Sequence, residues 1–339
     1  FSFQKSKNLS IIRCPLFVPS RPTAIKRLLH LASFSISSFI PMLGSVFWKP
    51  DIVIQVVPTL FCSIQTLFVA KFAGAKSVVH VQDYEVDAMF DLAIAKISLL
   101  KKTAYWVEKK VLNSFHTVST ISQGMLKRAI QKGVDQKKLL FFPNWTEVAR
   151  FENRSKNKQF LTDLGINPEK KIVLYSGNMG VKQGLESVVY AASFFKANND
   201  IHFVLVGEGV AKESLKKLSC ELNLKNISFL SLVPYSQLPD LLGSADCHLV
   251  IQKKGVADAV LPSKLTNILA VGGNSVITAK PDTTLGILCK DFAQIAVLVE
   301  PESVEALVAG IEQSLLMAIP NKIAKNYARE YLDKDIILK

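Results

Sequence analysis

Cysteine is scarce in this sequence and never stands at the spacing of a metal site. The five cysteines are odd in number and scattered along 339 residues, at Cys14, Cys62, Cys220, Cys247 and Cys289. This distribution argues against a disulfide framework or a zinc site, and it favours reduced thiols in a cytosolic protein. The first residues also lack the charged start, apolar core and cleavage site of a secretory signal peptide.

Acidic residues are few in the first half of the chain. Residues 1–150 contain 20 Lys and Arg against 8 Asp and Glu, whereas residues 151–339 contain 21 against 20. A basic half joined to a nearly neutral half indicates that the first half faces an anionic partner: nucleic acid, anionic lipid or a phosphorylated substrate. Because the basic residues are dispersed and no recognition motif accompanies them, the sequence argues against nucleic acid.

Strand and helix patterns alternate along most of the chain. Short apolar runs predict strands at 10–14, 51–57, 77–82, 116–120, 139–143, 171–177, 202–209, 227–230, 247–251, 275–278 and 296–299. Amphipathic runs predict helices between them, among which are 185–197, 212–222, 263–271 and 304–317. This alternation is typical of parallel, doubly wound α/β sheets. We therefore expect two α/β domains, residues 1–145 and 171–339, with a linker over residues 146–170.

Residues 28–48 form the most hydrophobic stretch and carry no formal charge. Lys26, Arg27 and Lys49 flank it, and its length permits a membrane span. However, it contains five serines and one proline, and Lys26, His30, Ser33 and Ser37 fall on one helical face. The sequence leaves three interpretations open: a helix on a membrane surface, an ordinary domain helix and a true span.

Three turns that suit anions follow predicted strands of the second half. They are residues 176–184 (SGNMGVKQG), Gly207-Glu208-Gly209, and Leu261-Pro-Ser-Lys264 at the start of a helix. Glycines allow backbone N–H groups to approach a phosphate, and helix N-termini add partial positive charge. Neither a Walker loop nor GxGxxG is present. Because open α/β sheets bind ligands at the carboxyl ends of their strands, these turns predict one diphosphate site.

Polar side chains also follow a predicted strand in the first half, from His80 to Asp87. Carboxylates stand at Asp83, Glu85 and Asp87. Ionisable side chains directly after a buried strand are typical of a cleft wall.

These motifs, read in order, resemble a known family. LYSGNMGVKQGLE, LVGEG, LPSKLTNILAVGG, HVQDYEVDA, TVSTIS and PNW are similar to motifs of retaining GT-B glycosyltransferases of family 4, in the branch of colanic-acid and exopolysaccharide biosynthesis. The resemblance implies two Rossmann-like domains facing across a cleft, with a nucleotide sugar in the C-terminal domain and the acceptor against the N-terminal one. It also implies that neither a metal nor another cofactor is needed.

The resemblance implies roles for individual residues. His80 would face the donor sugar, with Asp83 beside it. Lys182 and Lys264 would neutralise the diphosphate, and Glu208 would lie near the nucleoside. The full set of implied donor-binding residues is Gly177, Asn178, Gly180, Lys182, Gln183, Gly184, Glu208, Ser263, Lys264 and Asn267.

The sequence departs from the family pattern at several positions. Asn178 and Gln183 stand where the family has Arg and Lys, and Ala259 and Asn267 stand where it has two glutamates. Asn267 can supply part of the missing hydrogen bonding. The family's opening strand and glycine-rich acceptor loop have no counterpart before Phe1, so we expect an incomplete first domain.

The expected function is a retaining, hexosyl-type transfer from a GDP- or UDP-linked sugar to a lipid-linked glycan. We expect this reaction at the cytoplasmic face of a membrane, with the protein bound peripherally to the anionic surface. Two alternatives remain open: a nucleotide-sugar epimerase of the same fold, and a non-catalytic, truncated homologue that only binds nucleotide sugar.

Overall fold

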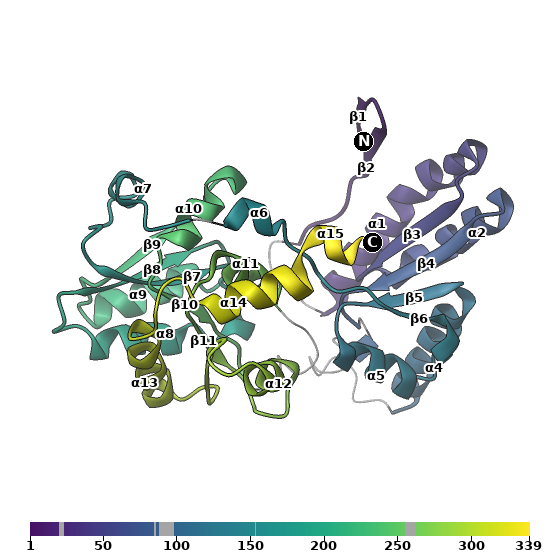
Figure 1. The fold of residues 1–339 in the computed structure, drawn as a ribbon. Coiled ribbons are helices and arrows are strands. Elements are labelled where there is room, and N and C mark those ends of the chain that lie inside the picture. Colours follow the sequence, from purple (N-terminus) through teal and green to yellow (C-terminus); the bar gives the residue numbers. More distant parts are fainter. Residues whose placement is uncertain (20–23, 85, 88–97, 153, 255–261) are drawn as a thin grey trace. The chain divides into compact units, whose positions relative to one another are not determined.

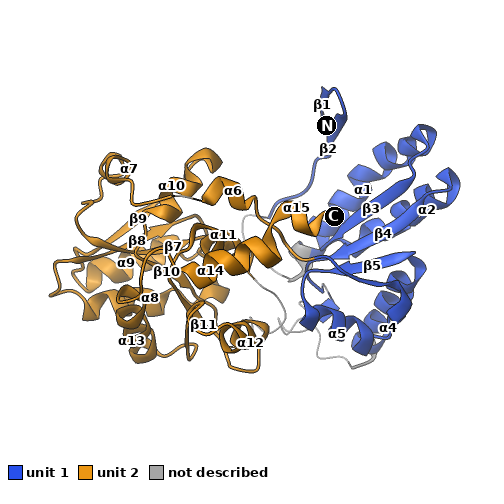
Figure 2. Cartoon of the chain, viewed as in Figure 1, with its two compact units in different colours: residues 1–142 blue, residues 143–339 orange. Residues whose placement is uncertain are grey.

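The computed structural model describes residues 1–19, 24–84, 86–87, 98–152, 154–254 and 262–339. The chain divides into two compact units, residues 1–142 and 143–339 (Figure 2). Each unit contains a parallel β-sheet with helices between its strands. The predicted α/β class, with one parallel sheet in each of two units, is therefore confirmed.

The first unit is built on a four-stranded parallel sheet of order β3-β4-β5-β6 (Figure 1). In β3, Val53, Gln55 and Val57 are buried while the alternate side chains are exposed, as the period of two of a strand requires. The elements of this sheet layer are β3 (Ile52–Val57), η2 (Leu60–Cys62), α2 (Ser63–Ala73), β4 (Lys76–Val81), α4 (Ser98–Ser114), β5 (Thr117–Thr120), α5 (Gln123–Gln131), η3 (Gln136–Lys138) and β6 (Leu139–Phe141).

The strand predicted at residues 10–14 exists but does not join this sheet. It is β2 (Leu9–Arg13), which pairs antiparallel with β1 (Ser2–Ser6) in a two-stranded hairpin. Only Lys7 and Asn8 separate the two strands, and so short a connection allows only antiparallel pairing. The expectation of a further parallel strand at this position is therefore wrong.

Residues 28–48 lie in α1 (Ala24–Gly44) and the short η1 (Ser45–Trp48). The stretch is long and apolar enough to cross a membrane by length and composition, and none of its residues is buried. Its polar side chains turn toward their own unit: Ser33 Oγ accepts from Phe17 N at 2.9 Å, and Ser35 Oγ donates to Phe61 O at 3.0 Å. Ile36 and Ile40, in contrast, are 75% and 78% exposed. The predicted helix thus presents an apolar face outward.

The second unit contains a six-stranded parallel sheet of order β12-β11-β10-β7-β8-β9. Its first strand, β7, lies between β8 and β10, so the strand order reverses there, and such switch points bind ligands in α/β folds. The elements of the sheet and its helices are β7 (Lys171–Ser176), η4 (Val181–Gln183), α8 (Glu186–Phe194), β8 (Ile201–Val206), α9 (Lys212–Glu221), β9 (Ile227–Leu230), η5 (Tyr235–Gln237), α10 (Leu238–Gly243), β10 (Cys247–Val250), α11 (Ser263–Val271), β11 (Ser275–Thr278), α12 (Thr284–Asp291), β12 (Val297–Val299) and α13 (Val304–Leu315).

Parts of the segment predicted as a linker, residues 146–170, pack into the core of the second unit. Val148 and Phe151 of α6 (Val148–Phe151) and Leu161 of α7 (Lys158–Asp163) are buried in one hydrophobic cluster. Near the end of the chain, α14 (Lys322–Tyr327) contributes Ala324 and η6 (Ala328–Leu332) contributes Ala328 and Leu332 to the same cluster, and α15 (Lys334–Ile337) follows them. Helices α6 and α7 of the predicted linker are therefore packed parts of the second unit.

Candidate functional site

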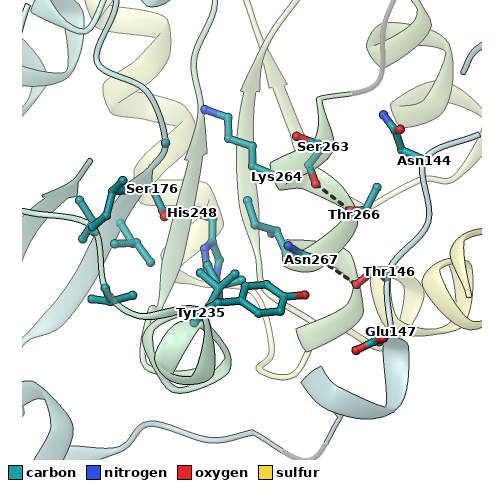
Figure 3. Close-up of a pocket in the computed structure, with 18 of the residues that line it drawn as sticks. Asn144, Thr146, Glu147, Ser176, Tyr235, His248, Ser263, Lys264, Thr266 and Asn267 are labelled. Atoms are coloured by element: carbon teal, nitrogen blue, oxygen red, sulfur yellow. Dashed lines mark hydrogen bonds between the residues drawn. The ribbon is translucent and has the colours of Figure 1, made fainter. Parts of the chain in front are cut away.

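A cavity of about 560 Å³ lies in the second unit at the switch point between β7 and β10 (Figure 3). It opens beside Ser176 and Gly177, where β7 ends, and beside the first turn of α11. Its walls are Asn144, Trp145, Thr146, Glu147, Leu174, Ser176, Gly177, Val206, Leu232, Val233, Tyr235, Leu238, Leu242, His248, Ser263, Lys264, Thr266, Asn267 and Ile268.

The loop after β7 packs directly on the turn after β8. Gly177 N donates to Val206 O at 2.9 Å, and Met179 N donates to Glu208 O at 2.8 Å. Gly207 has φ +153°, and a Cβ on it would lie 1.9 Å from Gly177 O. Only glycine permits this approach, so the predicted turn at Gly207-Glu208-Gly209 packs against the predicted turn of residues 176–184.

Asn178, Gly180 and Gln183 come together within that loop. A Cβ on Gly180 would lie 2.8 Å from Gln183 Oε1 and 3.0 Å from Asn178 Nδ2. The two amide side chains that replace the family's Arg and Lys therefore converge on one glycine. None of these three residues lines the cavity.

Lys264 is the predicted cation that the cavity contains. It stands in the first turn of α11, and its ammonium lies 4.1 Å from the centre of the Tyr175 ring. Burial lowers the pKa of Lys264 to about 7. In Figure 3 its side chain extends away from Asn267 and Thr266. An anion bound at this point would restore the ammonium charge.

Asn267 is oriented by a residue far away in the sequence. Its Oδ1 accepts a hydrogen bond from Thr146 Oγ1 at 2.7 Å, as Figure 3 shows. Because the carbonyl side of the amide is occupied, the NH₂ side remains as a donor for a ligand hydroxyl. Thr146 itself bridges to Asp333, which caps α15. The side chain of Asp333 accepts a hydrogen bond from Asp335 N, and it therefore acts as the N-cap of α15.

Two aromatic side chains, Trp145 and Tyr235, line the cavity. Tyr235 is 60% exposed, and the guanidinium of Arg150 lies 3.9 Å from the centre of its ring. Arg150 Nη2 also donates to Tyr235 O at 2.9 Å, which fixes the pair. Trp145 is a second aromatic wall of the same cavity. A flat, rigid ring beside open space is a surface on which a planar ligand can stack.

His248 forms part of the inner wall and was not anticipated from the sequence. It is the second residue of β10 and is almost completely buried. Burial lowers its pKa to about 4, so the imidazole is neutral at ordinary pH. Thr146, Tyr175 and Tyr235 were missed as well, because their neighbours in space are distant in sequence.

The remaining predicted donor residues do not line the cavity. Glu208 is paired with Lys212 Nζ at 2.8 Å, and this hydrogen bond lowers its pKa. Lys182 is exposed in η4, and its carbonyl accepts from Lys253 N. Gly184 follows η4 with φ +65°. Of the ten predicted donor residues, the cavity brings together Gly177, Ser263, Lys264 and Asn267.

His80 lies in β4 of the first unit. Its Nδ1 is 2.9 Å from Ser119 Oγ of the neighbouring strand β5, and its ring meets Phe142 edge-on at 5.6 Å. Burial lowers its pKa, which favours the neutral imidazole. Asp83 is exposed two residues beyond the end of β4. Glu85, Ala259 and Leu261 lie outside the described residues.

Asp87 belongs to a salt-bridge network. It accepts hydrogen bonds from Arg128 Nε at 3.0 Å, Lys132 Nζ at 2.8 Å and Tyr105 Oη at 2.8 Å. Burial raises the pKa of Asp87, but these hydrogen bonds outweigh burial and bring the pKa below its ordinary value. Lys132 also bridges to the buried Glu108 at 2.5 Å. Asp87 is therefore held by ion pairs within its own unit, and it does not stand as a free carboxylate after β4.

Two family models match the chain. Residues 156–331 match the family described as glycosyl transferases group 1, and residues 4–145 match the glycosyl transferase 4-like domain. The chain is 50% identical over 335 residues to an Escherichia coli (strain K12) protein named colanic acid biosynthesis glycosyl transferase WcaI. That alignment covers 97% of this chain and 82% of the relative.

Solved structures share the fold at low sequence identity. HepE of Anabaena, solved in complex with UDP and glucose, has a TM-score of 0.68 and 15% identity over 88% of this chain and 79% of HepE. Sucrose-phosphate synthase of Thermosynechococcus elongatus has the same TM-score and identity, over 98% and 82% of the two chains.

Proposed function

The chain belongs to the group 1 glycosyl transferases, a retaining family with the GT-B fold, and from this premise we propose that it acts in colanic acid or related exopolysaccharide synthesis. It transfers a sugar from a nucleoside-diphosphate donor to a lipid-linked glycan acceptor. The name of the Escherichia coli relative and the UDP bound to HepE support this assignment.

The reaction depends on stabilising the leaving group. As the glycosidic bond breaks, negative charge grows on the diphosphate, and donors fixed beforehand at that position lower the barrier. Lys264 and the N-terminus of α11 would act as such donors, since Ser263 and Lys264 of its first turn line the cavity. Their convergence at the switch point is the observation that carries the proposal.

Incubation with donor and acceptor tests the function directly. A transferase releases nucleoside diphosphate and lengthens a lipid-linked acceptor, whereas an epimerase converts the donor sugar without an acceptor. A protein that binds the nucleotide sugar and turns over neither would be the non-catalytic homologue. We expect acceptor-dependent release of the nucleoside diphosphate and no epimerised sugar.

The nucleobase of the donor is expected to stack on Tyr235. Replacing Tyr235 by Ala should weaken the binding of nucleoside diphosphates about tenfold, because base–aromatic stacking contributes about 1–3 kcal/mol per base. Isothermal titration with UDP, GDP and inorganic pyrophosphate measures the effect. Pyrophosphate, which has no base, should bind Tyr235→Ala and the wild type equally well.

Tyr235→Phe is the matched control, since it keeps the ring on Arg150. It should bind nucleoside diphosphates like the wild type. An equal loss of pyrophosphate affinity in Tyr235→Ala would instead show that the substitution disturbs the whole cavity.

We further propose that the first unit binds an anionic membrane through α1 and η1. Apolar side chains of both elements are exposed: Ile36 and Ile40 in α1, and Phe47 and Trp48, which are 90% and 80% exposed, in η1. Lys26 and Lys49 stand at its two ends, and basic residues near an anionic bilayer contribute about 1 kcal/mol each. A lipid-linked acceptor would then be met at the cytoplasmic face of the membrane.

Liposome co-sedimentation tests the membrane proposal. Binding should increase with the anionic lipid content and decrease at high salt, because salt shortens the Debye length and screens the attraction between the basic residues and the anionic headgroups. The double variant Ile36→Ser/Ile40→Ser should bind less, while Leu316→Ser, an exposed site of the second unit, should bind like the wild type. Association that resists salt and carbonate would indicate a span, and no association would leave an ordinary helix.

A further inference from the structure

Tyr175 contacts both parts of the diphosphate site, the loop of residues 177–184 and Lys264. It is the fifth residue of β7 and is 1% exposed. Its hydroxyl donates a hydrogen bond of 2.7 Å to Asn178 O, and its ring lies 4.1 Å from the Lys264 ammonium. One buried side chain thus touches the loop through its hydroxyl and the cation through its ring.

Lys264 and Tyr175 belong to opposite faces of the sheet. Helix α11 buries Leu265 and Ile268 in one hydrophobic cluster, whereas Tyr175 is buried in the other. The two side chains meet at Gly177: a Cβ there would lie 3.7 Å from Lys264 Cδ and 3.6 Å from Tyr175 Oη. Both side chains therefore reach Gly177, which has φ +151° in the region that favours glycine.

The hydroxyl of Tyr175 fixes one peptide of the loop. Burial raises its pKa, so it remains a protonated donor at ordinary pH. It holds the carbonyl of Asn178, while the next N–H, that of Met179, donates to Glu208 O at 2.8 Å. This peptide is therefore held from both sides before any ligand arrives.

We propose that Tyr175 is a positioning residue of the donor site, whose ring places the Lys264 ammonium and whose hydroxyl places the loop for one diphosphate. This inference rests on the proposed function, because it takes a nucleoside diphosphate as the ligand. An aromatic face attracts an ammonium, and a site arranged in advance loses less freedom on binding.

A double-mutant cycle separates the two roles. Tyr175→Phe removes only the hydroxyl and Tyr175→Leu also removes the ring, and each is made with Lys264 intact and with Lys264→Met. Dissociation constants are measured for pyrophosphate, UDP and GDP at about pH 6, where Lys264 is protonated. Tyr190→Leu, at an exposed tyrosine of α8, is the matched control, and melting temperatures report folding.

Tyr175→Phe should weaken binding by the same factor, about two- to tenfold, in both backgrounds, because the hydroxyl acts on the loop. Tyr175→Leu should weaken it at least about threefold further with Lys264 present, and no further in Lys264→Met. If the additional loss of affinity in Tyr175→Leu is equal in both backgrounds, or absent from both, the inference is overturned. If Tyr175→Leu does not fold, the Tyr175→Phe result by itself tests the role of the hydroxyl. A wild type that binds none of the probes would overturn the proposed function itself.

Discussion

Lys264→Met is expected to weaken the binding of the nucleotide-sugar donor by at least tenfold. Hydrogen bonds to charged groups contribute about 1.5–3 kcal/mol, and the ammonium of Lys264 is the cation that lines the donor cavity within the described residues. Methionine keeps the aliphatic stem beside Tyr175 but carries no charge. Isothermal titration with the intact nucleotide sugar measures the loss.

The same lysine should make donor binding depend on pH. Because burial lowers its pKa to about 7, the ligand-free site loses the charge of Lys264 as the pH rises above 7. Donor affinity should therefore fall between about pH 7 and 9 in the wild type. His248, with its pKa lowered to about 4, stays neutral throughout.

Lys264→Arg is the matched control, since arginine stays charged over this range. It should retain most of the affinity and lose the pH dependence. A wild-type affinity that is flat from pH 6 to 9, or a Lys264→Met variant that binds donor normally, would contradict the assignment of the diphosphate to this cavity.

Lys264 should also lower the stability of the ligand-free protein. Its folded pKa of about 7 is below the ordinary lysine value, so between these values the unfolded chain binds a proton that the folded chain does not. Stability should rise with pH across that window, and Lys264→Met should have a higher melting temperature than the wild type below pH 7.

His80→Ala is expected to reduce kcat about a hundredfold, the effect of losing the alignment of a reacting group. The histidine is held in β4 by Ser119 and by the edge-on ring of Phe142, which together fix its orientation. The donor dissociation constant and the melting temperature should change much less than kcat. Initial rates with donor and acceptor give the measurement.

Ser119→Ala offers a graded comparison for His80. It removes the hydroxyl at 2.9 Å from Nδ1 but leaves the imidazole in place, so its effect on kcat should be smaller. If His80→Ala folds normally and keeps its full rate, the histidine is a buried core residue and not a catalytic one.

The alternation of strands and helices could be predicted because it depends on neighbouring residues. The predicted helix at 263–271 and the strands at 227–230 and 275–278 coincide with α11, β9 and β11. The parallel arrangement follows from the same alternation, since each crossover needs a helix. The hairpin of β1 and β2 was missed, because the alternation at residues 2–6 was too weak to predict a strand that β2 could pair with.

The sequence by itself determined the α/β class, the glycine-rich turn at Gly177 and the place of Lys264 at a helix start, since each depends on local residue type and spacing. Only the tertiary structure decided that Thr146 orients Asn267, that the Tyr175 ring lies against the Lys264 ammonium, and that Asp87 forms salt bridges. These contacts join residues that are far apart in the chain. Burial, which sets the pKa of Lys264, likewise exists only once the chain has packed.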